Sequence, residues 1–146
     1  MDLQRYSIRN HKRRKNTFEF TSKGVREVLK VVELQETDQP GVYNLSMGDM
    51  IGGKISYSNI TNNKDTDIIM ATVAYIIYMF TTANPARYIF IKGDTEVKTR
   101  LYQIYLSNNL RRVQEKFKVW GGNTDGTGFE AFKKGKTYGG FLVKRV

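Results

Sequence analysis

A run of thirteen residues from Ile68 to Phe80 is apolar almost throughout, and it limits the possible folds more than any other feature. The run is bounded by Asp67 and Thr81 and is shorter than the roughly 17 to 25 residues that a membrane span requires. A helix that is apolar on nearly all sides must be covered on more than one of them. The sequence therefore predicts a buried core helix that lies across a sheet and ends at Asn84-Pro85.

The residues before this helix alternate between apolar and polar side chains, which predicts an antiparallel meander of three or four strands. Phe18 and Phe20 share one face of the first strand. Residues 25–36 fit a helical stripe or a strand, and their valines together with the preceding Gly24 favour a strand. The predicted strands cover residues 17–23, 25–36, the stretch around Tyr43 to Met47, and 54–58.

The residues after the core helix predict a strand at 88–92 and a second, amphipathic helix from about 95 to 116 with a break at 107–109. Seven glycines between Gly121 and Gly140 predict a mobile loop, after which a strand at 141–146 would close the sheet at an edge. The predicted fold class is α+β, a single mixed sheet with helices packed on it. Residues 1–16 are expected to form a basic N-terminal arm or edge strand, and residues 17–146 one domain.

The charge of the chain indicates the class of its partner. There are 24 Lys and Arg against 14 Asp and Glu, and the resulting formal charge of +10 attracts polyanions such as nucleic acid. The chain has no Cys and one His, so disulfides, thiolate catalysis and Cys-containing zinc sites are excluded, and no metal or other cofactor is expected. The basic start runs into polar residues instead of an apolar export signal, and a cytoplasmic protein that does not bind membranes is expected.

Basic and aromatic residues gather in segments that we predict to contact nucleic acid. The N-terminal cluster would contact phosphates as a flexible arm, or it would be a solvated tail. The start of the second helix would hold an anion, although its acid-before-base pairs four residues apart also stabilise the helix by themselves. The lysines and aromatic rings near the C-terminus would bind a strand, form a lid, or lie at the core edge. The predicted residues are Lys12, Arg13, Arg14, Lys15, Lys92, Lys98, Arg100, Arg111, Arg112, Phe129, Phe132, Lys133, Lys134, Lys136 and Tyr138.

Three functional hypotheses follow. The leading one is a non-enzymatic nucleic-acid-binding protein that prefers single strands or RNA, through phosphate contacts and aromatic stacking. The second is a small metal-independent ribonuclease or group-transferring toxin of a toxin-antitoxin pair, with Tyr102 as general acid or base and Arg100 stabilising charge. The third is an interaction protein whose basic face binds a small acidic protein.

Several stretches resemble an uncharacterised bacterial family that is common in Bacteroidota and is known as a domain of unknown function. The resemblance spans nearly the full length and implies one compact domain without assigning an activity. The stretches are Val42-Tyr43-Asn44-Leu45 with Gly48-Asp49, Asn62-Asn63-Lys64-Asp65 with Met70-Ala71-Thr72-Val73, and Gly93-Asp94-Thr95 with Thr99-Arg100-Leu101-Tyr102.

The order of elements is also similar to that of the N-acetyltransferases, which bind the pyrophosphate of their cofactor on a Gly-containing loop before the central helix. The corresponding residues 62–67 contain no glycine and two acids, Asp65 and Asp67, so acetyl transfer is not expected.

Overall fold

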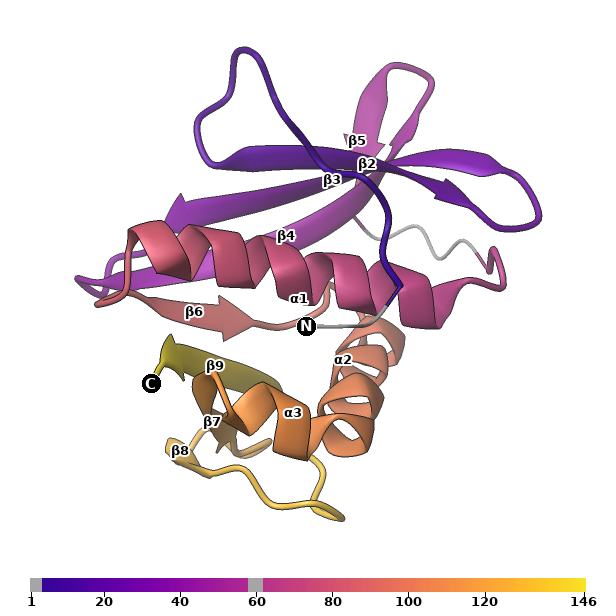
Figure 1. Ribbon diagram of the computed structural model, residues 1–146. Coiled ribbons are helices and arrows are strands. Elements are labelled where there is room, and N and C mark those ends of the chain that lie inside the picture. Colours follow the sequence, from indigo (N-terminus) through magenta and orange to yellow (C-terminus); the bar gives the residue numbers. More distant parts are fainter. Residues whose placement is uncertain (1–3, 58–61) are drawn as a thin grey trace.

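The structure, a computed structural model, describes residues 4–57 and 62–146, and its strands join in one mixed sheet (Figure 1). The strands are β1 (Arg9–Asn10), β2 (Thr17–Lys23), β3 (Glu27–Glu36), β4 (Val42–Ile51), β5 (Lys54–Ser56), β6 (Tyr88–Ile91), β7 (Phe117–Gly122), β8 (Phe129–Ala131) and β9 (Gly140–Arg145). The helices are α1 (Thr66–Ala83), α2 (Glu96–Asn108) and α3 (Leu110–Gln114). This architecture confirms the predicted α+β class.

The strand order is β1-β2-β3-β4-β6-β9-β7-β8, and β5 pairs with β4. Within the described residues β4 and β6 run parallel, and every other strand pair is antiparallel. The connection between β4 and β6 contains α1, as a parallel pair requires a crossover. Two predicted segments extend beyond what the structure describes: Met1 to Leu3 of the arm, and Ser58 at the end of the fourth predicted strand.

The N-terminal meander has the predicted strands. β2 has the predicted bounds, and Phe20 on it is fully buried. In β3 the four consecutive residues 31–34 are all buried, because the core covers one face of the strand and the loop after β1 with the β4–β5 hairpin covers the other. Cover on both faces explains why this strand has no clear alternation in the sequence.

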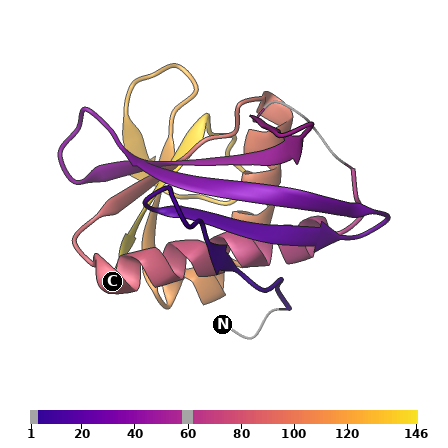
Figure 2. The same cartoon turned by 90° about the horizontal axis from the view of Figure 1, so that it is seen from above.

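The helix α1 is the predicted core helix, longer by two residues before the apolar run and three after it. Thr81 and Thr82 fit into its last turn because their hydroxyls donate to the carbonyl oxygens of Ile77 and Tyr78, at 2.7 Å in both cases. By length and composition α1 could cross a membrane, but half of it is buried inside the protein, as in the core helix of a globular fold. The view from above shows α1 along one side of the strands (Figure 2).

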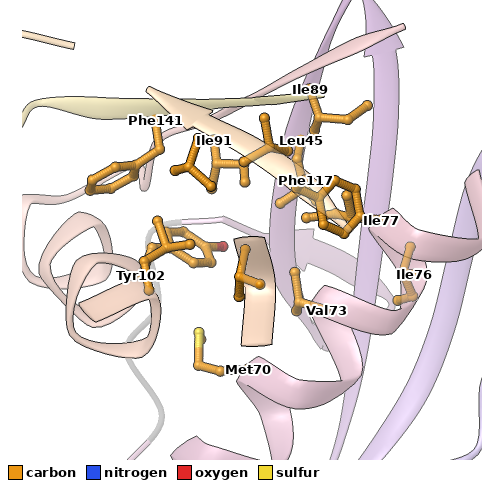
Figure 3. Close-up of a cluster of buried hydrophobic side chains, with 14 of the residues drawn as sticks. Leu45, Met70, Val73, Ile76, Ile77, Ile89, Ile91, Tyr102, Phe117 and Phe141 are labelled. Carbon is orange, nitrogen blue, oxygen red and sulfur yellow. The ribbon is translucent and has the colours of Figure 1, made fainter. Parts of the chain in front are cut away.

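The core lies between the helices and one face of the sheet. Figure 3 shows side chains from α1, α2 and the strands pointing into the same space, with Ile76 and Phe141 fully buried there. Tyr102 of α2 also lies in this cluster and lines an apolar cavity of about 50 Å³. The core therefore joins the N-terminal and C-terminal halves of the chain.

Two expectations for the C-terminal part are wrong in detail. β9 does not lie at an edge but between β6 and β7, and β8 is the edge strand. This central position follows from burial, since Phe141 and Val143 both point into the core. The Gly-rich segment is not one long loop either, because it begins within β7 and contains β8. The predicted break in the second helix is confirmed at Asn109, between α2 and α3.

Candidate functional site

The sheet has an inner face that packs on the core and the helices, and an outer face that is more exposed. Residues paired across neighbouring strands point to the same face. Asn44, Phe90, Leu142 and Trp120 form one such row across β4, β6, β9 and β7, and all four are half-buried. Their chain neighbours on the inner face are buried. The row therefore lies on the outer face, which no described helix covers.

Four aromatic side chains gather on the outer face, and we call them the aromatic face: Tyr88, Phe90, Trp120 and Phe129. The ring centroids of Tyr88 and Trp120 are 5.8 Å apart, and those of Phe90 and Phe129 are 6.1 Å apart with the ring planes nearly perpendicular. Phe129 is 50% exposed, although a ring of its size normally avoids water. Groups of aromatic rings that are partly open to solvent are typical of surfaces that take part in binding.

Two glycines make room for these rings. Gly122 and Gly140 pair across β7 and β9. A Cβ on Gly140 would lie 2.8 Å from Cζ of Phe90, and a Cβ on Gly122 would lie 3.0 Å from Cε1 of Phe129. Both rings therefore lie directly against the backbone of the sheet, and the Gly-rich composition of this segment serves the shape of the outer face.

Lysines surround the aromatic face. The Nζ atom of Lys144 lies 5.2 Å from the ring centroid of Tyr88, and Lys118 is the partner of Lys144 on the adjacent strand. Lys92 follows the end of β6, two residues after Phe90. Among the residues that the structure describes, these three lysines form no ion pair with a carboxylate. Their charge therefore adds to a positive field over the aromatic face.

The predicted N-terminal arm is largely fixed in place. Tyr6 donates its hydroxyl to Asp65 Oδ2 at 2.5 Å and its main-chain N–H to Thr72, and β1 pairs with β2. The basic residues lie in the loop after β1, where His11 Nδ1 accepts the main-chain N–H groups of Arg13 and Arg14, each at 3.1 Å. The structure thus holds the predicted phosphate-binding cluster in an ordered turn.

We call the loop between β1 and β2, residues 11–16, the basic loop. Together with the β4–β5 hairpin it forms a groove of about 540 Å³ over β3, and we call this groove the basic groove. Arg14 Nη1 lies 3.5 Å from Glu33 Oε1. Glu33 is on the outer face, because it pairs with Ser46, which lies two residues after Asn44 on the same side of β4. Tyr57 donates its hydroxyl to the same carboxylate, and burial followed by this hydrogen bond raises the pKa of Tyr57 to about 12. The groove is lined by His11, Arg13, Arg14, Val31, Met50, Gly53, Lys54, Ile55 and Tyr57.

Three of the predicted binding residues are buried, so their side chains are not open to a ligand in this structure. Lys98 donates to the main-chain carbonyls of Tyr57 and Met47, and its burial lowers its pKa. Phe132 and Tyr138 are 7% and 2% exposed and pack against each other in the core. The interpretation of these two rings as base-stacking groups is not supported, because the core already contacts them.

The remaining predicted residues are dispersed. Lys12 and Lys15 are exposed in the basic loop, Lys133 and Lys134 are exposed after β8, and Lys136 pairs with Glu130 at 2.7 Å. Arg111 and Arg112 lie on α3, which packs on the inner side of β7. They are therefore separated by the sheet from the aromatic face.

The two catalytic candidates are not brought together. Arg100 lies with Lys92 in a groove of about 430 Å³ beside the start of α2. Tyr102 points the other way into the core, and burial raises its pKa further above its ordinary value. A phenol in that position exchanges protons with difficulty at neutral pH. In the described part of the chain, no group of acidic or histidine side chains has the arrangement of a metal site.

The candidate site was only partly predicted from the sequence. Phe129, Lys92, Arg13 and Arg14 were expected to bind, but Tyr88, Phe90, Trp120, Lys118 and Lys144 were not. A signal was present in the strand Tyr88–Ile91, where aromatic and aliphatic residues alternate. Such alternation indicates that one face of a strand differs from the other.

The chain belongs to a family of unknown function, DUF6934, whose model matches residues 2–146. No curated protein and no solved structure was found to be similar to it. The family assignment agrees with the predicted uncharacterised domain and assigns no activity to the site.

Proposed function

We propose that this protein binds single-stranded nucleic acid, DNA or RNA, on the outer face of its sheet, in the cytoplasm. The observation that carries the proposal is the aromatic face, four side chains from three strands that lie without helix cover beside Lys92, Lys118 and Lys144. Aromatic rings stack on the flat surfaces of unpaired bases, and lysines neutralise the phosphates between them. A duplex keeps its bases inside and cannot use such rings.

Charge supports the same ligand class. The described residues contain three ion pairs, Arg14–Glu33, Lys30–Asp49 and Lys136–Glu130, for a chain with 24 Lys and Arg. Most of the positive charge is therefore not cancelled by a neighbouring carboxylate. Such a surface attracts a polyanion over several ångströms and speeds its association.

The intrinsic fluorescence of Trp120, the one tryptophan of the chain, gives a direct test. Oligonucleotides of about 12 nucleotides, within the site sizes known for single-strand surfaces, should quench it on binding, and a duplex of the same sequence should quench it less. If the three lysines neutralise three phosphates, the logarithm of affinity should fall against the logarithm of salt concentration with a slope of about −2.

A matched pair of variants separates the aromatic face from general effects. Tyr88→Ala removes a ring of the outer face that lies next to Lys144. Tyr75→Ala removes a ring on α1, whose centroid lies 3.7 Å from the guanidinium carbon of Arg5. Loss of one stacked base should weaken binding by about 5- to 150-fold in Tyr88→Ala. Tyr75→Ala should bind as the unchanged protein does.

Two results would contradict the proposal. One is the absence of binding to single strands at low salt. The other is an equal loss in Tyr88→Ala and Tyr75→Ala. A complex with an acidic protein that survives nuclease treatment and competes with oligonucleotides would replace nucleic acid by that partner.

Ribonuclease, toxin and acetyl-transfer activities are not proposed. Tyr102 is buried and lies away from the groove that holds Arg100. Asp65 at the N-cap of α1 and Asp67 in its first turn place carboxylates where a pyrophosphate would need donors.

A further inference from the structure

We infer that a bound strand continues from the aromatic face across β4 and into the basic groove, where Arg13, Arg14 and Lys54 contact its phosphates. This inference rests on the proposed function and adds the path of the ligand and a second binding region. The basic groove is separate in sequence from the aromatic face, since the loop after β1 and the β4–β5 hairpin form it.

The two regions lie on the same face of the sheet. The row that contains Trp120 and Phe90 continues through Asn44 to its partner Gln35 on β3. Glu33, two residues before Gln35, is the residue that Arg14 and Tyr57 contact. From β8 to β3 there are five strand spacings, which correspond to about 24 Å. A short oligonucleotide spans this distance without leaving the surface.

The path between the two regions carries polar groups without net charge. Asn44 and Ser46 lie on β4 between Phe90 and Glu33, and Asn44 Nδ2 donates to Ser46 Oγ at 3.2 Å. Neutral amides and hydroxyls exchange hydrogen bonds with base edges and sugars. They do not repel a phosphate chain that crosses them.

Among the described residues, two acids lie beside the basic groove on the outer face: Glu19, the register partner of the groove-lining Val31, and Glu33, whose charge is offset. The Glu33 carboxylate accepts from Tyr57 and from Gln35 Nε2 at 3.1 Å, and the guanidinium of Arg14 lies 3.5 Å away. Arg13 and Lys54 form no ion pair in the part of the chain that the structure describes. The basic groove therefore keeps a positive charge with which it can bind phosphate.

The test compares two double variants that remove the same charge. Arg13→Gln with Lys54→Gln changes two residues that line the basic groove. Lys12→Gln with Lys15→Gln changes two exposed residues of the same basic loop that do not line the groove. Neither pair includes a residue of the aromatic face or of an ion pair in the described structure, so both variants should fold.

The measurement is affinity for homopolymer oligonucleotides of increasing length, from about 3 to about 12 nucleotides. The groove variant should bind the shortest oligonucleotide as the unchanged protein does. The unchanged protein should bind longer oligonucleotides more tightly, and the groove variant should lack this gain in affinity. For the longer oligonucleotides, the slope of the logarithm of affinity against the logarithm of salt concentration should be shallower by about 1.4 in the groove variant, which is the contribution of two phosphates. The loop variant should keep both the gain and the slope.

The outcomes distinguish this inference from the proposed function. If short oligonucleotides bind through the aromatic face and the two double variants behave alike at every length, the path into the basic groove is wrong and the proposed function stands. If the unchanged protein binds no oligonucleotide of any length, the proposed function fails and the path fails with it.

Discussion

Gln103 holds Tyr138 in place through its side-chain amide: Gln103 Oε1 accepts the main-chain N–H of Tyr138 at 3.1 Å. The same amide donates through Nε2 to the carbonyl oxygen of Lys136 at 2.5 Å. One side chain of α2 therefore fixes two points of the loop between β8 and β9. The ring of Tyr138 lies under this loop, against Gly121.

Replacement of Gln103 should loosen that loop without unfolding the protein. Gln103→Leu removes two hydrogen bonds, each of which contributes about 0.5–1.5 kcal/mol. The amide protons of residues 136–138 should then exchange with solvent about tenfold faster, as hydrogen exchange followed by mass spectrometry or NMR would show. Gln114→Leu, an exposed glutamine on α3, is the control. Equal exchange in both variants would mean that Gln103 does not anchor the loop.

Gly140 should not tolerate a side chain. In Gly140→Ala the new methyl group meets the ring of Phe90 at 2.8 Å, so the ring must move away from the sheet. Such overpacking costs about 1–3 kcal/mol, and thermal unfolding should occur at a lower temperature. Gly139→Ala is matched, because its nearest contact would be an ordinary 3.6 Å. If both variants unfold at the same temperature, Phe90 does not rest on Gly140.

The difference between Phe129 and Tyr138 shows where prediction from sequence ended. Both rings belong to the same Gly-rich segment and have similar neighbours in the chain. Tyr138 is buried because Gly121 leaves space for it on the inner face, while Phe129 lies over Gly122 on the outer face. Which glycine lies beneath which ring depends on strand pairing, and local pattern does not contain that information.

Local patterns were sufficient where a strand pairs with its neighbour in the chain. The bounds of β2 and the existence of α1 follow from alternation and from the apolar run. The position of β9 between β6 and β7 depends on contacts between residues far apart in sequence. For that reason the sequence alone could not show that Tyr88 and Trp120 lie on the same, outer face of the sheet.

The buried ion pair of Lys30 and Asp49 should be necessary for stability. The two charged groups are 2.5 Å apart and both side chains are almost fully buried. Lys30→Met removes one of the cations near the buried Asp49 carboxylate, since Lys98 also senses that charge, and breaking a buried ion pair costs up to about 3–5 kcal/mol. Chemical denaturation should show this loss. Lys136→Met, which breaks an ion pair at the surface, should change the unfolding free energy much less, because solvent already screens that pair. If both variants lost the same unfolding free energy, burial would not make the Lys30–Asp49 pair more important for stability than the surface pair.

Stability should fall in alkaline solution, and Tyr57 should account for part of that fall. Its pKa is raised from 10 to about 12 by burial and by the hydrogen bond to Glu33. Between these values the unfolded chain releases the phenol proton and the folded protein keeps it. The stabilisation is therefore fully present below pH 10 and is lost as the pH rises toward 12. Tyr57→Phe cannot release a proton, so its unfolding free energy should fall less steeply over this range in denaturant titrations.

The other tyrosines decide how this result is interpreted. Burial also raises the pKa of Tyr6, Tyr43 and Tyr138, so some alkaline loss should remain in Tyr57→Phe. Tyr75→Phe serves as the control for removal of a hydroxyl, because Tyr75 is a half-buried tyrosine on α1, away from Glu33. It should keep the full pH dependence of the unchanged protein. If Tyr57→Phe also kept it, burial and the hydrogen bond to Glu33 would not hold the phenol of Tyr57 protonated in the folded state.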